Sequence, residues 1–236
     1  DRPMRPLFPK DYRNDVTLNN MVMSVDPQCN PEVVAMLGSS IATCISDIPF
    51  DGPCAATQVG MIDGELIINP TLEQNSRSDL KLTVASTREK VIMIEAGANE
   101  VPEAKMIEAI FEADKVNKEI IAFIDKIVAD CGKAKHSYES CAVPEELFAA
   151  MKEIVTPEEM EVAVFSDDKQ TREENIRQVT AKLEGAFADN EEWLAVLGEA
   201  VYQYQKKTVR KMILKDHKRP DGRAITQIRP LAAEVD

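Results

Sequence analysis

Clusters of basic side chains are the feature of this sequence best suited to chemistry, because lysine and arginine neutralise phosphate groups. Two stretches qualify, one at the start of the chain and one at its end. The first contains Arg2, Arg5, Lys10 and Arg13, and the second runs from Lys206 to Arg229. Since the whole chain carries a net charge of −13, any contact with a polyanion must be local, and we predict no DNA binding.

Motifs that make and break bonds are missing from the sequence. It contains no phosphate-binding glycine loop, no Gly-x-Ser-x-Gly elbow, no His-Glu-x-x-His zinc motif and no Gly-x-x-Gly clamp of the KH type. The two histidines, His136 and His217, lie beside lysines in polar stretches, which favours surface positions over general bases. The acidic pairs of the second half fall at or near predicted helix starts, where the helix dipole favours negative charge. We therefore predict no catalytic and no metal-ligating residue in this chain.

The cysteine and hydropathy patterns favour a globular cytoplasmic protein. The five cysteines are odd in number and never two or three residues apart, so neither a disulfide framework nor a zinc site is indicated. Cys44 lies in an apolar helical run and is predicted to be a small buried side chain. No stretch approaches the roughly 18 consecutive apolar residues of a membrane-spanning helix, so no membrane association is predicted.

The first hundred residues predict an α+β fold. Asn30-Pro31 is a helix start, with apolar residues at helical spacing up to Ile45. Residues 15 to 25 are rich in β-formers and predict a strand before this helix. Further strands are predicted at 54 to 62, 65 to 69, 80 to 86 and 91 to 96, and Asp63-Gly64 predicts a hairpin turn between the first two. The order β-α-β-β-β-β indicates a meander rather than a doubly wound parallel sheet.

The later part of the chain predicts helices. From Pro102 onward the apolar residues keep a 3.6-residue period up to Gly132, which indicates one long helix with an interruption near Lys115. Thr156-Pro157 and the pair Asp189 and Glu192 predict two further helix starts. The helical pattern ends at a turn signal, Pro220-Asp221-Gly222, and an extended tail follows.

Six segments of the sequence resemble the bacterial polynucleotide phosphorylase family. They occur in the family's order, at similar intervals, and together span nearly the whole chain. The segments are DRPMRPLFP at 1 to 9, MLGSSIATCISDIPFDGP at 36 to 53, INPT at 68 to 71, EAGANEV at 95 to 101, RPDGR at 219 to 223 and IRPLAAEV at 228 to 235.

The resemblance implies two ribonuclease-PH-like cores joined by an all-helical domain and followed by KH and OB-type RNA-binding domains. On this map residues 1 to 100 are the second part of the first core, 101 to 215 are the all-helical domain, and 216 to 236 lead into the second core. The segmentation from hydrophobic pattern places the same boundaries. The resemblance also implies a homotrimeric ring around an RNA channel.

The activity that the resemblance implies is 3′-to-5′ phosphorolysis of single-stranded RNA, which degrades mRNA. Inorganic phosphate, the co-substrate, attacks the terminal phosphodiester and releases a nucleoside diphosphate, and Mg²⁺ helps to neutralise the charge. In the family the phosphate-binding and metal-binding residues belong to the second core. The resemblance therefore implies that they lie beyond Asp236, and that this chain is scaffold and RNA-channel wall, inactive alone.

Arg2 and Arg5 are the candidate contacts to RNA phosphate. They lie next to the point where the family's RNA-gripping loop would enter, and guanidinium groups match phosphate oxygens. The alternative is that both form structural ion pairs with core carboxylates. For Arg219 and Arg223, which resemble the family's domain-connecting motif, we expect a structural anchoring role.

A second function stays open at this point. The chain could be a truncated, non-catalytic paralogue that acts as an RNA-binding or protein-binding assembly module. Its acidic helical segment would then be a docking face, although a charged helix surface is usually only solvated.

Overall fold

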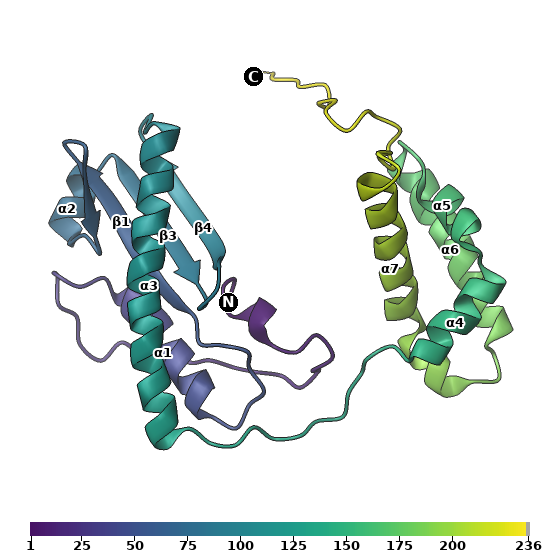
Figure 1. Ribbon diagram of the computed structural model, residues 1–236, viewed down its shortest axis with the longest axis horizontal. Helices are drawn as coiled ribbons and strands as arrows, with labels where there is room; N and C mark the ends of the chain where they lie inside the picture. The colour runs from purple at the N-terminus through teal and green to yellow at the C-terminus, as the bar shows by residue number, and fades with distance from the viewer. Residues whose placement is uncertain (235–236) are drawn as a thin grey trace. The chain divides into compact units, whose positions relative to one another are not determined.

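The computed structural model describes residues 1 to 234 of the chain. It divides into two compact units, Asp1–Ser140 and Cys141–Asp236, which are visible in Figure 1. Residues 235 and 236 lie outside the described residues. The segment 228 to 235 and the tail 216 to 236, both named above, are therefore described only up to residue 234. No helix within residues 1 to 234 combines the length and apolar composition that crossing a bilayer requires.

A four-stranded antiparallel sheet forms the centre of the first unit (Figure 1). In the spatial order β2-β1-β3-β4 its strands are Glu65–Ile68, Ala55–Ile62, Leu80–Ser86 and Val91–Ala98. Asp63 and Gly64 close the hairpin between β1 and β2, both with positive φ, 51° and 81°, as a type I′ turn requires. The four strands predicted between residues 54 and 96 are confirmed.

Helix α1, Pro31–Ile45, begins where the sequence predicted. The Asn30 side chain accepts a hydrogen bond from the Glu32 backbone N–H, and Pro31 occupies the first turn. Helix α2, Leu72–Arg77, was not predicted, because six residues are too few to show a helical period. A capping box between Thr71 and Gln74 stabilises its start.

Helix α3, Glu103–Cys131, crosses one face of the sheet without interruption (Figure 1). Ala109 and Ala113 are fully buried against β1 and β3, so small side chains allow the helix to approach the sheet closely. The predicted interruption near Lys115 is therefore absent. The apolar period weakens near Lys115 because some polar residues there face the sheet. Asn117, for example, forms a hydrogen bond to the backbone of β3. Because of this packing α3 belongs to the first unit, whereas the sequence pattern grouped it with the later helices.

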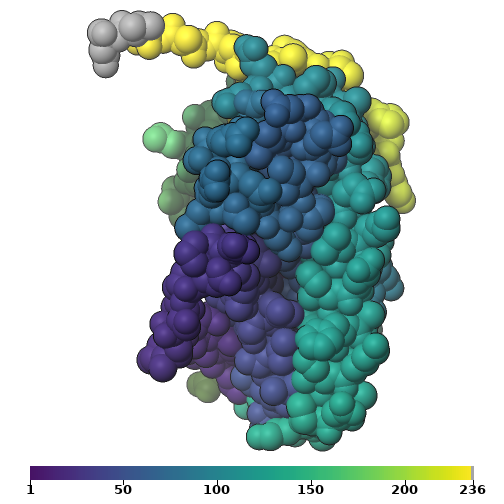
Figure 2. Space-filling view, turned by 90° about the vertical axis from the view of Figure 1, so that its left-hand side faces the viewer, coloured from purple at the N-terminus to yellow at the C-terminus, as the bar shows by residue number. Residues whose placement is uncertain are grey.

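The strand predicted over residues 15 to 25 is not formed, and that prediction was wrong. No backbone–backbone hydrogen bond joins residues 13 to 25 to the rest of the described chain. Met21 and Met23 are 74% and 85% exposed, and Figure 2 shows this part of the chain in purple on the outside of the first unit. β-Propensity expresses packing against a neighbouring strand, and this segment has no such neighbour among residues 1 to 234. The α+β fold class is nevertheless confirmed.

Four helices form the second unit: α4, Glu145–Ile154; α5, Pro157–Val164; α6, Lys169–Ala186; and α7, Glu191–Leu214. The predicted start of α5 is confirmed by a capping box between Thr156 and Glu159. The start of α7 lies one residue later than predicted, since the side chain of Asn190 rather than Asp189 caps the helix. Apolar side chains from all four helices fill one core, with Leu147, Met160, Leu183 and Met212 completely buried.

Candidate functional site

Arg2 lies beside β4 and pairs with a carboxylate far away in the sequence. Its Nη1 is 2.8 Å from Oε2 of Glu95, and the two side chains are 64% and 67% exposed. An ion pair this exposed contributes on the order of 0–1 kcal/mol to stability. The guanidinium of Arg2 is therefore accessible to an anion from solvent.

Arg5 pairs with a neighbour in its own segment. Its Nε and Nη2 donate to both carboxylate oxygens of Asp1 over 2.8–3.2 Å, a bidentate arrangement. These side chains are also mostly exposed, at 77% and 68%. Both arginines thus form ion pairs, but with surface carboxylates rather than the core carboxylates of the alternative interpretation. Their contact with RNA stays a prediction.

Met4 positions both arginines. Its side chain is buried with Cys44, Phe50 and Cys54 in a small core to which α1, α3 and the N-terminal segment contribute. Because Met4 is fixed, the residues on either side of it are held at the surface. The 3-10 turn Arg5–Leu7 then carries the chain away from this anchor.

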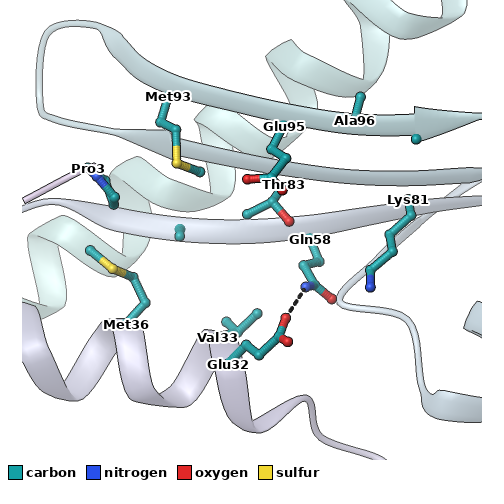
Figure 3. Close-up of a pocket in the computed structure, with 12 residues that line it drawn as sticks. Pro3, Glu32, Val33, Met36, Gln58, Lys81, Thr83, Met93, Glu95 and Ala96 are labelled. Atoms are coloured by element: carbon teal, nitrogen blue, oxygen red, sulfur yellow. Dashed lines mark hydrogen bonds between the residues drawn. The ribbon is translucent and has the colours of Figure 1, made fainter. Parts of the chain in front are cut away.

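A cavity of about 570 Å³ lies beside the Arg2–Glu95 pair, between α1 and the sheet face opposite α3 (Figure 3). Glu32, Val33 and Met36 line it from α1, and Gln58, Lys81, Thr83, Met93 and Glu95 line it from the strands. Figure 3 shows the Gln58 amide pointing toward Glu32. The Gln58 Nε2 donates to the Glu32 Oε2 over 3.3 Å, and the Asn30 amide donates to the Gln58 Oε1 over 2.6 Å.

The cavity is lined by a mixture of charged, polar and apolar side chains. Its charged side chains are two carboxylates, Glu32 and Glu95, and one ammonium group, Lys81. The lining residues include no cysteine, serine or histidine that could form a nucleophile–base pair. Sequence reasoning missed this cavity, although the alternation of Leu80 and Leu82 with Lys81 and Thr83 indicates a polar face on β3.

The buried cysteines and the two histidines have the following surroundings. Cys44 is buried as predicted, and burial raises the pKa of its thiol. Burial also raises the pKa of Cys54 to about 11, so both thiols stay protonated at neutral pH. His136 is half-buried, with its Nε2 3.4 Å from the Tyr12 hydroxyl, and His217 is exposed.

Across residues 1 to 234, no three His, Cys, Asp or Glu side chains are grouped so that they could hold a metal ion. The Mg²⁺ that the sequence resemblance implies stays an expectation, since Mg²⁺ often takes only one or two protein carboxylates and completes its coordination with water.

Arg219 and Arg223 both bind one carboxylate in the tail of the second unit. The Arg219 Nη2 and Arg223 Nη1 lie 2.6 Å and 2.9 Å from Oδ2 of Asp221. Gly222 has a φ of +74°, which glycine tolerates without strain. The Arg219 Nη1 also donates to the Gln227 carbonyl over 2.6 Å. These contacts order the turn and the start of the tail, and the anchoring role expected from the sequence stays a prediction.

Protonation of Asp221 is expected to loosen this turn. The Arg219 guanidinium, together with that of Arg223, lowers the pKa of the Asp221 carboxyl. Because the pKa of Asp221 is lower in the folded chain than in the unfolded chain, its ionised carboxylate stabilises the turn at pH values above the unfolded pKa of about 4. This stabilisation is lost as the pH falls through the folded pKa. Hydrogen-exchange protection of the Gly222 amide should fall between about pH 5 and about pH 2. In Asp221→Asn protection should be low throughout; an unchanged pH profile would contradict this assignment.

Part of each unit matches the model of a described family. Residues 52–116 match the model of the 3′ exoribonuclease family, domain 2. Residues 146–224 match the model of the polyribonucleotide nucleotidyltransferase RNA binding domain. The first match lies within the first unit and the second within the second unit.

Several curated relatives align with the whole chain. A polyribonucleotide nucleotidyltransferase of Lachnoclostridium phytofermentans is 73% identical, with the alignment covering 100% of this chain and 34% of the relative. The protein of the same name from Ruminiclostridium cellulolyticum is 48% identical, with coverages of 100% and 33%. The chain thus spans about a third of the length of these relatives. It belongs to the polyribonucleotide nucleotidyltransferase family.

Proposed function

We propose that this chain is part of an enzyme that degrades single-stranded RNA from its 3′ end by phosphorolysis. The observation that carries the proposal is the 73% identity, over the whole chain, to a polyribonucleotide nucleotidyltransferase. In the reaction an oxygen of inorganic phosphate forms a bond to the terminal phosphorus. The bond to the 3′ oxygen of the preceding nucleotide breaks, and a nucleoside diphosphate leaves.

Within that enzyme the chain acts as a frame and as a wall of the RNA path. The proposal is supported by the exposed guanidinium groups of Arg2 and Arg5, which solvent anions can reach. The groups that bind phosphate and Mg²⁺ lie in other parts of the longer protein, and the isolated chain is inactive. This chain helps to position the RNA. Positioning of the reactants accounts for a large part of catalysis in phosphoryl transfer.

The longer protein is proposed to be a cytoplasmic homotrimer. Exposed apolar side chains on α3, including Ile107, Phe111 and Phe123, support an assembly, because a neighbouring subunit would cover them. Analytical ultracentrifugation of the longer protein checks the stoichiometry. A monomer at micromolar concentration would contradict it.

Phosphate dependence is the experiment that tests the proposed reaction. The longer protein is incubated with single-stranded RNA, with and without inorganic phosphate, in the presence of Mg²⁺. We expect nucleoside diphosphates only when phosphate is present. RNA loss at the same rate without phosphate, with monophosphates as products, would identify a hydrolase instead.

Loss of both N-terminal arginines is expected to weaken RNA binding by the longer protein. In Arg2→Ala/Arg5→Ala two phosphate contacts disappear, so the slope of log affinity against log salt should fall by about 1.4. KM for RNA should rise about tenfold, while kcat at saturating RNA stays within twofold.

The matched control removes two exposed, ion-paired cations from the second unit, Arg177→Ala/Lys182→Ala, and should leave KM unchanged. If Arg2→Ala/Arg5→Ala instead lowers the melting temperature without changing KM, the two arginines have only the structural role.

A further inference from the structure

The C-terminal half of α7 carries a dense group of exposed basic side chains: Lys206, Lys207, Arg210, Lys211 and, directly after the helix, Lys215. Residues four apart lie on the same side of a helix, so Lys206 aligns with Arg210, and Lys207 aligns with Lys211. Two neighbouring rows of positive charge therefore follow the helix axis.

These five cations lack acidic partners among residues 1 to 234, unlike most of the other cations of the second unit. Lys169, Arg177, Lys182 and Lys218 each form an ion pair with a glutamate. The contrast is pronounced because residues 141 to 200 carry fifteen acidic and only five basic side chains. Acidic groups are thus abundant in this unit, yet none neutralises the basic rows of α7.

Structural roles account for only some of these cations. Lys211 and Lys215 lie at the helix C-terminus, where positive charge offsets the helix dipole. The Lys207 Nζ lies 4.2 Å from the centroid of the Phe148 ring, a cation–π contact that links α7 to α4. Neither explanation applies to Lys206 and Arg210, which lie more than one helical turn before the end of α7 and form no cation–π contact with the described part of the chain.

An exposed aromatic side chain continues the first row. Tyr202 precedes Lys206 by one helical turn and is 57% exposed. Proteins that bind single-stranded nucleic acids combine cations that follow the backbone with aromatic rings on which bases stack. One helical turn is about 5.4 Å, a spacing similar to that of successive phosphates along an extended strand.

We propose that Tyr202, Lys206, Arg210 and Lys211, called the α7 basic face below, bind the backbone of single-stranded RNA. The proposal deepens the proposed function and rests on it for the identity of the polyanion. Lysine and arginine neutralise phosphates, and Tyr202 stacks on one base. Binding is insensitive to RNA sequence, because neither phosphate contacts nor stacking depend on which base is present.

The test measures binding of the 236-residue chain to a fluorescein-labelled single-stranded RNA of mixed sequence, by anisotropy over a range of salt concentrations. In Lys206→Gln/Arg210→Gln/Lys211→Gln, affinity should fall at least tenfold at low salt. The salt slope should decrease by about 2, or about 0.7 for each lost phosphate contact. Tyr202→Ala should weaken binding about tenfold without changing the salt slope.

The control, Lys169→Gln/Arg177→Gln/Lys182→Gln, has the same change in net charge and lies on α6 of the same unit. Its RNA affinity should stay within twofold of the original chain. Equal losses in both triple variants, unchanged affinity in the α7 variant, or no RNA binding by the original chain would each overturn the proposal. Fluorescence of Trp193 verifies that every variant is folded.

This test is separable from that of phosphorolysis. If the longer protein does not require phosphate but the α7 variant loses RNA affinity, the proposed reaction fails and the RNA-binding face stands. If RNA degradation by the longer protein requires phosphate but the α7 substitutions leave RNA affinity unchanged, the proposed reaction stands and the proposed RNA contact of α7 is wrong.

Discussion

Asn117→Leu is expected to lower the free energy of unfolding of the first unit by about 3 kcal/mol. Asn117 is completely buried where α3 meets the sheet. Its Nδ2 donates to the Val84 carbonyl over 3.0 Å and to the Ser86 hydroxyl over 3.1 Å, and its Oδ1 accepts from the Thr57 hydroxyl over 2.8 Å. Leucine has a similar volume but leaves these buried polar groups unpaired, at about 1–3 kcal/mol for each unsatisfied group.

Hydrogen exchange of the β1 and β3 amides in increasing urea measures this loss. Glu119→Ala, on the exposed side of the same helix, is the control and should change stability by less than about 0.5 kcal/mol. If the leucine variant were as stable as the original chain, the hydrogen-bond network would not hold α3 on the sheet.

Leu183→Ala is expected to destabilise the second unit by about 3 kcal/mol. Leu183 comes from α6 and is completely buried in the core of this unit, with Met160 and Leu197. Truncation removes buried apolar surface and leaves a cavity that surrounding helices fill only in part.

The chain contains a single tryptophan, and its fluorescence reports on this unit selectively. The Trp193 ring packs edge-on against Phe187, with centroids 5.1 Å apart, so its environment changes when the core opens. Glu184→Ala, next to Leu183 but exposed, should shift the urea midpoint only slightly. Equal midpoints for both variants would mean that α6 does not pack as described.

Local signals in the sequence were sufficient for most elements. Asp63-Gly64 and Asn30-Pro31 specify a turn and a helix start through their own backbone preferences, and the structure confirms both. The strand expected over residues 15 to 25 does not form, because strand formation depends on more than local sequence. Its composition suits a strand, but pairing depends on a second strand that composition cannot reveal.

The long helix α3 shows a second limit of pattern reasoning. Polar side chains near Lys115 weaken the apolar period and were interpreted as an interruption. Asn117 is polar because it binds Thr57 and Ser86 inside the interface. A buried hydrogen-bond network and a helix break look alike in a hydrophobicity pattern.

The candidate site was predictable only in part. Residue type and position singled out Arg2 and Arg5, but the partner of Arg2 is Glu95, 93 residues away in sequence. The neighbouring cavity joins α1 to three strands, and no local motif connects those residues. Likewise, the basic run near Lys206 was visible in the sequence, whereas its lack of acidic partners required the folded second unit.

Nucleoside diphosphate release by the 236-residue chain alone tests most directly whether the reacting groups lie elsewhere in the longer protein. The chain and the longer protein are incubated at equal concentrations with single-stranded RNA, inorganic phosphate and Mg²⁺. We predict RNA binding by both and diphosphate release by the longer protein only. Diphosphate release by the isolated chain, at a rate proportional to its concentration, would contradict the assignment of this chain as the part that positions RNA.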